Sequence, residues 1–546
     1  MIITYCEKIL IEKKRLTLYS SNIMNKTILN PILPGFYPDP TACCVDGVYY
    51  VVNSSFVYFP GLPVFKSTDL CNWEQIGNVI DRPEQMTFLG QSTSRGLFAP
   101  CIRYSNGTFY CICTNVDDGG NFFVTAKDPA GPWSKPVYMP KADGIDPSFF
   151  FDDDGSCWYI GTHPAPEGCK YNGNWEIYIQ KVDLATGDLL GSPKGIWRGA
   201  LKNCIWPEGP HLYKINGWYY LLHAEGGTGP EHAVCVARAK SLDDEFVGKP
   251  ANPILTHRHL GMGADIVYVG HADLFEDKDG KWWLVLLASR PFSNDGKRPR
   301  FCNMGRETFM VPVIWEDEWP LASWQTGLVE KEYDTDGNVL RRYNAKEEKK
   351  LPSRKNTFTK AELDYEWISL RNRNPEKVFV KDNALVLKGA EDLGSLQEAS
   401  FVARRQIDFS YDAETIMDAE LPNDGNACCL SCFQNENYFY KLQVVNKGGK
   451  LFVQVMIREN GEIKILAEKE LPEFAGVENP KEVAGFSLMV KQNLQNLSFY
   501  CNGELLLENA DASMLSVEKA GGFVGTVIGM FASGEGAEAV FRSFEM

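Results

Sequence analysis

The sequence predicts an all-β protein, a five-bladed β-propeller followed by a C-terminal β-sandwich. One unit of about 50 to 60 residues recurs five times, and the last third of the chain alternates apolar and polar residues as strands do. The 48 Gly, 30 Pro and 12% aromatic residues are typical of many short strands joined by tight turns. With 546 residues, the chain also exceeds the about 250 to 300 residues that one core can serve.

Each repeat contains a short strand, a turn that ends in glycine and an aromatic-rich second strand. The five segments read DPTACCVDGVYYVV, APCIRYSNGTFYCIC, DPSFFFDDDGSCWYIG, GPHLYKINGWYYLLH and HADLFEDKDGKWWLVLL. Asp-Gly and Asn-Gly pairs supply the positive φ angles of hairpin turns, so we expect turns at Gly47, Gly107, Gly155, Gly217 and Gly280. A further strand-like run follows each hairpin, which gives the four strands of a propeller blade. Turn chemistry alone also fits a sandwich of hairpins, but recurrence of the whole unit favours the propeller.

These patterns divide the chain into four parts. We expect an N-terminal extension over residues 1–29, the propeller over 30–325, a polar linker over 326–355 and the sandwich over 356–546. The linker assignment follows from the charged run EKEYDTDGNVLRRYNAKEEKKLPSRK. Within the extension, Met24 is a candidate for the true start of the protein.

Charge and hydropathy exclude several kinds of partner. A net charge of -16 and a pI of about 5.1, with no basic patch, exclude nucleic acid. No run approaches the about 18 apolar residues of a spanning helix, so no membrane association is expected. The first 23 residues are interrupted by charges and carry no signal-peptide core, which predicts a cytoplasmic protein. The sequence leaves open whether the chain forms a homo-oligomer.

The 16 cysteines are interpreted as reduced, buried thiols. They include two adjacent pairs and lie mainly in strand-like runs, which fits a cytoplasmic setting better than a disulfide framework. Cys429 and Cys432 form one CxxC, but a zinc site of that kind needs a second pair, so this motif is assigned to the core.

The repeat also aligns candidate catalytic residues. The innermost strand of each propeller blade lines the axis, so residues that open these strands converge on one central pocket. The aligned residues are Asp39, Ala99, Asp146, Glu208 (just before Gly209) and His271. Taken one at a time, Asp39 and Asp146 precede proline and would be interpreted as turn or strand-end residues, and Glu208 in WPEGP as a loop residue. The hypothesis that these acids are catalytic rests on their occurrence at the same repeat position in three blades.

Clustered carboxylates repel one another, so at least one has a raised pKa and holds a proton near neutrality. One protonated and one ionised carboxyl group form the general acid and general base that cleave a glycosidic bond. Aromatic side chains around such a cluster would stack on a sugar. The sequence therefore predicts a sugar-processing site on the propeller axis.

At this point the sequence resembles glycoside hydrolase family 43, and in particular its two-domain β-xylosidases and α-L-arabinofuranosidases. The similarity runs from Asn30 to the end of the chain. It rests on NPILPGFYPDP, GLFAPCIRY, GIDPSFFFDDDG, WPEGPHLYK, GHADLF and GRETFMVPVIWEDEWP. Each motif is weak alone, and together they are specific.

The resemblance implies a role for each candidate residue. Asp39 would be the general base that activates water, Glu208 the general acid, and Asp146 the carboxylate that raises the pKa of the acid and orients it. The substrate-binding residues would be Phe56 and Trp73, which wall the sugar pocket, and Arg306, which donates to sugar hydroxyls.

The resemblance also concerns cofactors and the second domain. His271 matches a histidine that approaches a metal ion, commonly calcium, directly or through water. We treat this ion as structural and optional, because the reaction requires no cofactor. The sandwich would lend a loop to one side of the pocket and so restrict the enzyme to chain ends.

The predicted function is that of an exo-acting, inverting glycosidase that releases xylose or arabinose from xylo- or arabino-oligosaccharides. A non-catalytic carbohydrate-binding propeller and an arabinan-degrading enzyme of the same fold are the alternatives. The sequence does not decide between xylose and arabinose. Two other motifs are rejected: HAEGG at His223 lacks the HExxH spacing of a zincin helix, and STDLCNWE lacks the Gly and Thr of a sialidase Asp-box.

Overall fold

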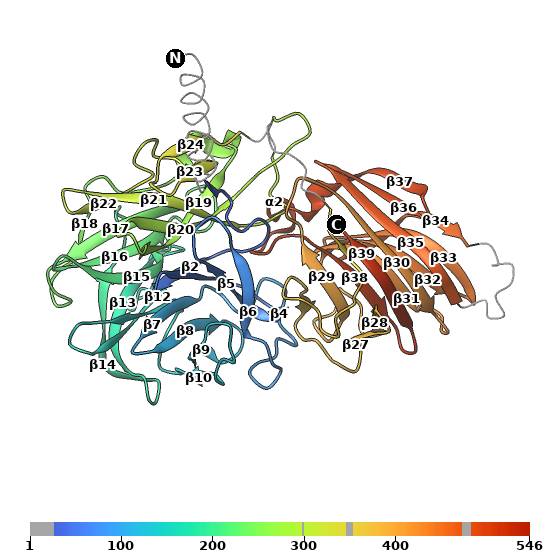
Figure 1. Ribbon diagram of the computed structural model, residues 1–546, viewed down its shortest axis with the longest axis horizontal. Coiled ribbons are helices and arrows are strands. Elements are labelled where there is room, and N and C mark those ends of the chain that lie inside the picture. The colour runs from blue at the N-terminus through green and yellow to red at the C-terminus, as the bar shows by residue number, and fades with distance from the viewer. Residues whose placement is uncertain (1–26, 298–299, 345–352, 472–481) are drawn as a thin grey trace, which may run out of the picture.

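The computed structural model describes residues 27–297, 300–344, 353–471 and 482–546. Two bodies built of strands lie side by side, the propeller to the left and the sandwich to the right in Figure 1. The predicted extension up to Lys26, with Met24, lies outside the described residues. In the described part of the chain, no helix has the length and apolar character to cross a bilayer.

Five separate four-stranded antiparallel sheets form the blades. Blade 1 contains β2 Thr41–Val45, β3 Val48–Val52, β5 Gly61–Ser67 and β6 Glu74–Ile80. Blade 2 contains β7 Cys101–Ser105, β8 Thr108–Asn115, β9 Gly120–Ala126 and β10 Val137–Tyr138. Blade 3 contains β11 Ile145–Phe151, β12 Cys157–Pro164, β13 Trp175–Asp183 and β14 Asp188–Trp197. Blade 4 contains β15 Glu208–Ile215, β16 Trp218–Glu225, β17 Ala233–Ala239 and β18 Val247–Gly248. Blade 5 contains β19 Val267–Glu276, β20 Trp282–Ser289, β21 Glu307–Glu316 and β22 Trp319–Ala322. A 3₁₀ helix, η1 Arg258–Gly263, connects blades 4 and 5.

The blades close into a ring. The innermost strands contact one another in the order β2, β7, β11, β15, β19, and β19 returns to β2. The predicted turn glycines all have positive φ, between 72° and 81°, and each follows the first strand of its blade. The prediction of five hairpins and a propeller is confirmed, because the Asp-Gly and Asn-Gly turns fix each blade locally.

A buried ion pair crosses the ring below the strand starts. The Asp273 carboxylate of blade 5 accepts from Arg103 Nη1 of blade 2 at 2.8 Å, from Thr41 Oγ1 of blade 1 at 2.6 Å, and from the Tyr213 hydroxyl of blade 4. Arg103 Nη2 lies 3.0 Å from Nδ1 of His211. Burial lowers the pKa of His211 to about 3, so the ring is neutral and Nδ1 accepts this hydrogen bond. One carboxylate thus connects four blades.

The polar segment after blade 5 is partly structured. β1 Thr27–Leu29 pairs with β23 Glu332–Asp334, which pairs with β24 Val339–Arg341, so part of the segment expected as a linker packs on the propeller. Residues 345–352 of that segment lie outside the described residues. A second short sheet joins the two bodies, since β4 Tyr58–Phe59 of the propeller pairs with β26 Ser369–Leu370.

Two sheets pack face to face in the sandwich. One contains β25 Lys355–Asn356, β27 Val378–Lys381, β28 Ala384–Lys388, β30 Ser410–Glu420, β35 Glu482–Asn493, β36 Asn496–Cys501, β37 Glu504–Asp511 and β39 Glu538–Glu545. The other contains β29 Ser400–Arg405, β31 Ala427–Asn435, β32 Tyr438–Lys447, β33 Lys450–Glu459, β34 Glu462–Glu470 and β38 Val527–Ser533. The short helices η3 Ala512–Leu515 and α2 Val517–Ala520 precede β38.

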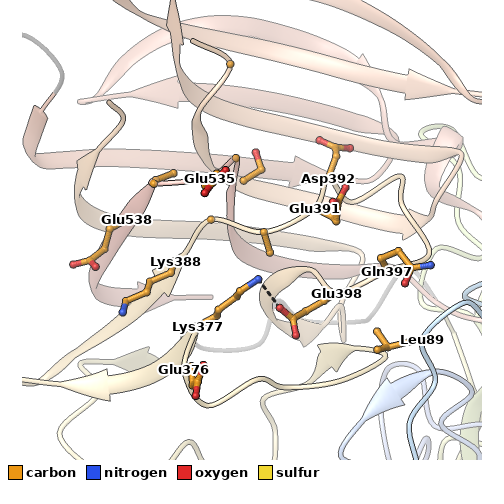
Figure 2. A pocket seen from close by; sticks show the side chains of 17 residues that line it. Leu89, Glu376, Lys377, Lys388, Glu391, Asp392, Gln397, Glu398, Glu535 and Glu538 are labelled. Atoms are coloured by element: carbon orange, nitrogen blue, oxygen red, sulfur yellow. Dashed lines mark ion pairs between the residues drawn. The ribbon is translucent and has the colours of Figure 1, made fainter. Parts of the chain in front are cut away.

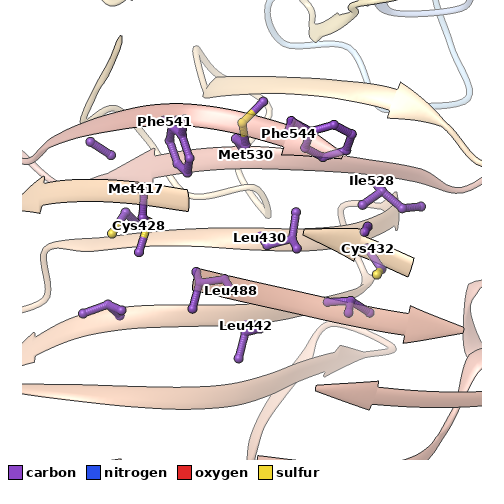
Figure 3. Packing of buried hydrophobic residues seen from close by; sticks show 14 of the residues in the cluster. Met417, Cys428, Leu430, Cys432, Leu442, Leu488, Ile528, Met530, Phe541 and Phe544 are labelled. Carbon is purple, nitrogen blue, oxygen red and sulfur yellow. The ribbon is translucent and has the colours of Figure 1, made fainter. Parts of the chain in front are cut away.

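Apolar side chains fill the space between these sheets, as Figure 3 shows for Leu430, Leu488 and Phe541. Cys432 belongs to this core, whereas Cys429 belongs to the cluster between sandwich and propeller. Residues three apart on a strand point to opposite faces, which explains why this CxxC is divided between two cores.

The interface between the two bodies is apolar and contains buried ion pairs, among them Arg371–Glu436 and Arg290–Glu307. Arg371 of the sandwich is fully buried, binds Glu436 through Nη2, and donates from Nε to the Gln91 carbonyl oxygen at 2.7 Å. Glu436 also accepts from the Thr93 backbone N–H at 2.6 Å. These contacts hold the sandwich against the loop before blade 2.

Candidate active site

In four of the five blades, a residue with positive φ lies in the first half of the innermost strand or just before it. Asp39, Asp146, Gly209 and His271 have φ of 50°, 51°, 55° and 47°. In blades 3, 4 and 5 the pairing of the innermost strand is also interrupted beside this position. A residue with positive φ at a bulge turns its side chain out of the strand, here toward the axis.

This conformation agrees with the predicted alignment. The residue of blade 4 that is equivalent to Asp39 and Asp146 is Gly209, and Glu208 precedes it by one position. A Cβ at Gly209 would lie 2.9 Å from Cε1 of His271, so only glycine allows both the positive φ and the packed imidazole. The structure therefore brings the three acids to one site, but Glu208 reaches it from the neighbouring position.

Asp39 is held as a carboxylate. It is 5% exposed and accepts from Arg306 Nη1 at 2.7 Å and from Ser54 Oγ at 2.5 Å. Burial would raise the pKa of Asp39, but the charge of Arg306, the nearby His271 and the Ser54 hydroxyl together outweigh burial and lower it. Asp39 is therefore ionised at neutral pH.

Glu208 has the opposite environment. Removal of water by the surrounding protein, followed by the charges of Asp146 and Asp39, raises the pKa of Glu208 well above its ordinary value. The side chain is partly exposed, whereas Asp146 is buried. Burial also raises the pKa of Asp146, and its Oδ2 accepts from the Gly209 backbone N–H at 3.1 Å. Asp146 is thus tied directly to the residue that follows the acid.

Blade 3 fixes the segment that carries Glu208. Thr162 Oγ1 of β12 donates to the Pro207 carbonyl oxygen at 2.6 Å, and Ser148 Oγ of β11 donates to the Pro210 carbonyl oxygen at 2.5 Å. Because both flanking peptides are held, the position of the Glu208 carboxyl group is set by blade 3 as well as by its own strand.

Aromatic rings and Arg306 form one wall of the site. Phe56 stacks between Phe36 and Phe523, with centroid distances of 5.8 and 6.0 Å. Phe56 is only 1% exposed, so the rings that remain partly open are Phe98 and Phe523. Phe56 is therefore covered by Phe523, and its predicted contact with the sugar stays a prediction.

Arg306 lies between the base and this wall. Besides Asp39, it donates from Nη1 to Thr228 Oγ1 at 3.0 Å and from Nη2 to the Phe523 carbonyl oxygen at 3.2 Å. A guanidinium has five N–H donors, so further N–H groups remain for a ligand. Arg306 thus lies beside Asp39, and its donation to sugar hydroxyls stays a prediction.

The structure places Trp73 away from the site, and its predicted sugar contact is wrong. Thr41, which follows Asp39 closely, pairs with Val52 at one end of blade 1. Trp73 precedes β6 in the β5–β6 turn, and Ser67 at the start of that turn pairs with Tyr49 at the other end of the blade. About five residues of strand, about 17 Å, separate the two ends. Its indole donates to the Leu70 carbonyl oxygen at 3.1 Å and packs on the core.

His271 lies against Gly209, and the calcium ion that the resemblance implies near it stays a prediction. Calcium requires six to eight oxygen ligands. Asp39 is bound by Arg306, and Asp273, two residues beyond His271, is bound by Arg103. Among the described residues, no set of three imidazole, thiol or carboxyl groups within 4.8 Å of one another includes His271.

Four residues at the site were not found from the sequence: Ser54, Phe98, Thr228 and Phe523. Ser54 and Thr228 lie in loops outside the repeat pattern. Phe523 comes from the sandwich, where its backbone N–H donates to Ser94 Oγ at 2.9 Å. The resemblance predicted a loop from the second domain, but no sequence signal identified the residue.

A hollow of about 1170 Å³ lies mainly on the sandwich, with Leu89 of the propeller among its lining residues. Figure 2 shows that its labelled side chains are mostly charged, and Lys377 binds Glu398 at 2.7 Å. No aromatic ring is among its lining residues, and most of its acids have no basic partner in the hollow. Sugars bind at aromatic surfaces, so this hollow does not compete with the axial site.

Glycoside hydrolysis requires two carboxyl groups at one site, one protonated and one ionised. The fold and the site thus define the protein as a glycoside hydrolase. Two family profiles match the chain, "Glycosyl hydrolases family 43" over residues 28–320 and "Beta xylosidase C-terminal Concanavalin A-like domain" over residues 355–546. The chain belongs to glycosyl hydrolase family 43, and the resemblance seen in the sequence is confirmed.

Similar proteins match nearly the whole chain. A xylosidase/arabinosidase of Butyrivibrio fibrisolvens is 44% identical over 514 residues, which are 93% of this chain and 96% of that protein. A non-reducing end alpha-L-arabinofuranosidase of Bacteroides ovatus is 33% identical over 94% of this chain and 93% of its own length. The crystal structure of a xylan beta-1,4-xylosidase of Bacillus halodurans has a TM-score of 0.82 at 29% identity and covers 95% of this chain and 99% of that chain.

Proposed function

We propose that the protein removes single β-D-xylosyl and α-L-arabinofuranosyl residues from the non-reducing ends of xylo- and arabino-oligosaccharides, with inversion at the anomeric carbon. The observation that carries this proposal is the division of protonation between Asp39 and Glu208. The names of the relatives support both sugars, since the most similar of those reported above is a xylosidase/arabinosidase.

In the proposed reaction, Asp39 removes a proton from a water molecule that attacks the anomeric carbon. The lowered pKa keeps Asp39 ionised, and the Ser54 and Arg306 hydrogen bonds fix the direction of its free lone pairs. Glu208 donates its proton to the departing glycosidic oxygen. A carboxylate, a carboxylic acid and water supply every bond change, so the hydrolysis needs no cofactor, and calcium has no step in it.

The chain-end preference follows from the second domain. Phe523 and its loop stand against Phe56 and Phe98 and cover one side of the pocket. A polymer that continued through this side would collide with the loop, so we propose that only a terminal sugar enters. An arabinan-degrading enzyme that cuts internal bonds would need this side open.

The proposed function is tested with p-nitrophenyl β-D-xyloside, p-nitrophenyl α-L-arabinofuranoside, xylobiose and a linear arabinan. We expect release of monosaccharide from the first three substrates and no internal cleavage of arabinan. Proton NMR should detect the inverted anomer first. Binding of these sugars without hydrolysis would contradict the proposal and favour a carbohydrate-binding propeller, and a retained anomer would contradict the assigned mechanism.

Replacing Asp146 with Asn should act through Glu208. Removing the neighbouring negative charge lowers the pKa of Glu208, and the acid must be protonated, so the alkaline limb of kcat/KM should move to lower pH. The amide can still accept from the Gly209 N–H, so the backbone should stay in place. An unchanged pH profile, measured with xylobiose, would contradict the role of Asp146. Asp188→Asn, which changes an exposed acid of blade 3, is the control.

Replacing Phe523 with Ala should raise KM about fivefold with little change in kcat, because one aromatic contact contributes about 1 kcal/mol in the ground state and the transition state alike. Phe452→Ala, which removes a partly exposed ring of the sandwich outside the pocket, is the matched control. Equal KM values in the two variants would show that the sandwich does not contact the sugar. The cytoplasmic location stays a prediction from the sequence, and the oligomeric state stays open.

A further inference from the structure

Trp206 precedes the catalytic acid Glu208 by two residues. Among the described residues, its indole belongs to none of the hydrophobic clusters that form the cores of the two bodies. The side chain is partly exposed. A large aromatic ring that no core uses, and that lies beside a catalytic group, is a candidate for contact with a ligand.

The indole of Trp206 contacts loops of two blades. Gly173 belongs to the loop between β12 and β13 of blade 3, and Gly227 belongs to the loop between β16 and β17 of blade 4. A Cβ at Gly173 would lie 3.1 Å from Cδ2 and Cε2 of the indole, and a Cβ at Gly227 would lie 2.7 Å from Cε3. Both loops therefore approach the ring with backbone that carries no side chain, and the ring lies where blades 3 and 4 meet.

The backbone of Trp206 is held in a strained conformation. Its φ is 44°, which a bulky residue rarely adopts. The Trp206 N–H donates to the Gly173 carbonyl oxygen at 2.8 Å, and the Gly226 N–H donates to the Ile205 carbonyl oxygen at 3.0 Å. Such strain persists only where the surrounding structure fixes it, and it is frequent at ligand sites. The ring is therefore held in place before a sugar binds.

The same loop of blade 4 connects the ring to the catalytic pocket. Thr228, which follows Gly227 directly, accepts from Arg306 at 3.0 Å, and Arg306 donates to the catalytic base at 2.7 Å. Trp206 is thus next to the acid along the chain and next to the support of the base in space. The indole therefore borders the pocket on the side of blades 3 and 4.

The sandwich covers another part of the pocket rim. Phe523 lies 6.0 Å from Phe56 and 5.8 Å from Phe98 between ring centroids, and its carbonyl oxygen accepts from Arg306. Phe56 follows β3 of blade 1, Phe98 precedes β7 of blade 2, and Arg306 precedes β21 of blade 5. Blades 3 and 4 are left for the departing part of the substrate, which must pass Glu208.

We propose that Trp206 is the stacking surface for the departing sugar, the unit whose glycosidic oxygen receives the proton of Glu208. This inference rests on the proposed function. One face of a pyranose ring carries mainly C–H groups, and such a face packs on an indole. Stacking would hold the glycosidic oxygen at the acid, so the enzyme would favour an oligosaccharide over a xyloside with a small leaving group.

Xylobiose and methyl β-D-xyloside test the inference, because both leaving groups depart as alcohols and need the acid, but only xylobiose has a sugar ring to stack. Trp206→Ala should lower kcat/KM for xylobiose about fivefold, the contribution of one aromatic contact, and change that for methyl β-D-xyloside by less than about twofold. Trp206→Phe keeps a ring and should retain most of the activity on xylobiose. Trp324→Ala, which removes an exposed indole after the outer strand β22, is the matched control and should change neither substrate.

A fourth variant guards against loss of the fold. Trp206→Leu fills the space between the two loops without a flat ring and should lose activity on xylobiose as Trp206→Ala does. Full xylobiose activity in Trp206→Leu would overturn the inference. Equal losses on both substrates would show that the ring only positions Glu208, and would overturn it as well. Unmodified enzyme that hydrolyses neither xyloside would contradict the proposed function itself, and this inference with it.

Discussion

Asp39→Asn is expected to reduce hydrolysis of every pentoside by about 10³- to 10⁴-fold, the effect of removing a general base. The base acts on water rather than on the leaving group, so xylobiose and dinitrophenyl xyloside should lose activity alike. Asparagine can still accept from Ser54, so the loss reflects proton transfer rather than unfolding. The acid limb of the kcat/KM profile, which reports ionisation of Asp39, should disappear in the variant.

The control for this experiment is Asp188→Asn, an exposed acid of blade 3 outside the pocket, whose kinetics should match the unmodified enzyme. Thermal unfolding of both variants shows whether the fold persists. If Asp39→Asn kept more than about a tenth of its activity on both substrates, another group would be the base.

Glu208→Ala is expected to reduce cleavage of xylobiose by about 10²- to 10⁴-fold and that of dinitrophenyl xyloside by less than about tenfold. A sugar leaves poorly as an alkoxide and needs the proton of Glu208, whereas dinitrophenolate leaves unaided. Gly209 and the hydrogen bonds to Pro207 and Pro210 remain, so the loop should keep its position.

Brønsted analysis over a series of aryl xylosides measures this difference. The rate of Glu208→Ala should depend steeply on leaving-group pKa, and that of Asp39→Asn should not. The reverse pattern would exchange the two roles and contradict the protonation states inferred from Arg306 and Asp146.

Local chemistry explains how much of the fold was predictable. Each blade carries its own turn glycine, such as Gly47 and Gly217, and a hairpin forms from contacts within about 15 residues. The same repeat predicted that Asp39, Asp146 and Glu208 converge. The repeat also placed Glu208 just before Gly209, and the φ of 55° at Gly209 agrees with that alignment.

The remaining site features depend on long-range contacts that no local pattern encodes. Phe523 meets Arg306 across 217 residues and Ser94 across 429. Trp73 was misplaced because an aromatic residue in a blade turn has the same local appearance at either end of the ring. The strand register, seen in the pairing of Tyr49 with Ser67, decides which end it occupies.

The carboxylate of Asp273 lies on the axis below these catalytic groups, and no backbone ladder connects the five sheets to one another. Asp39 and Glu208 belong to blades 1 and 4, and Asp273 binds side chains of those same two blades, Thr41 and Tyr213. We therefore expect Asp273 to help set the distance between blades 1 and 4, and with it the separation of Asp39 and Glu208, without taking part in the reaction itself.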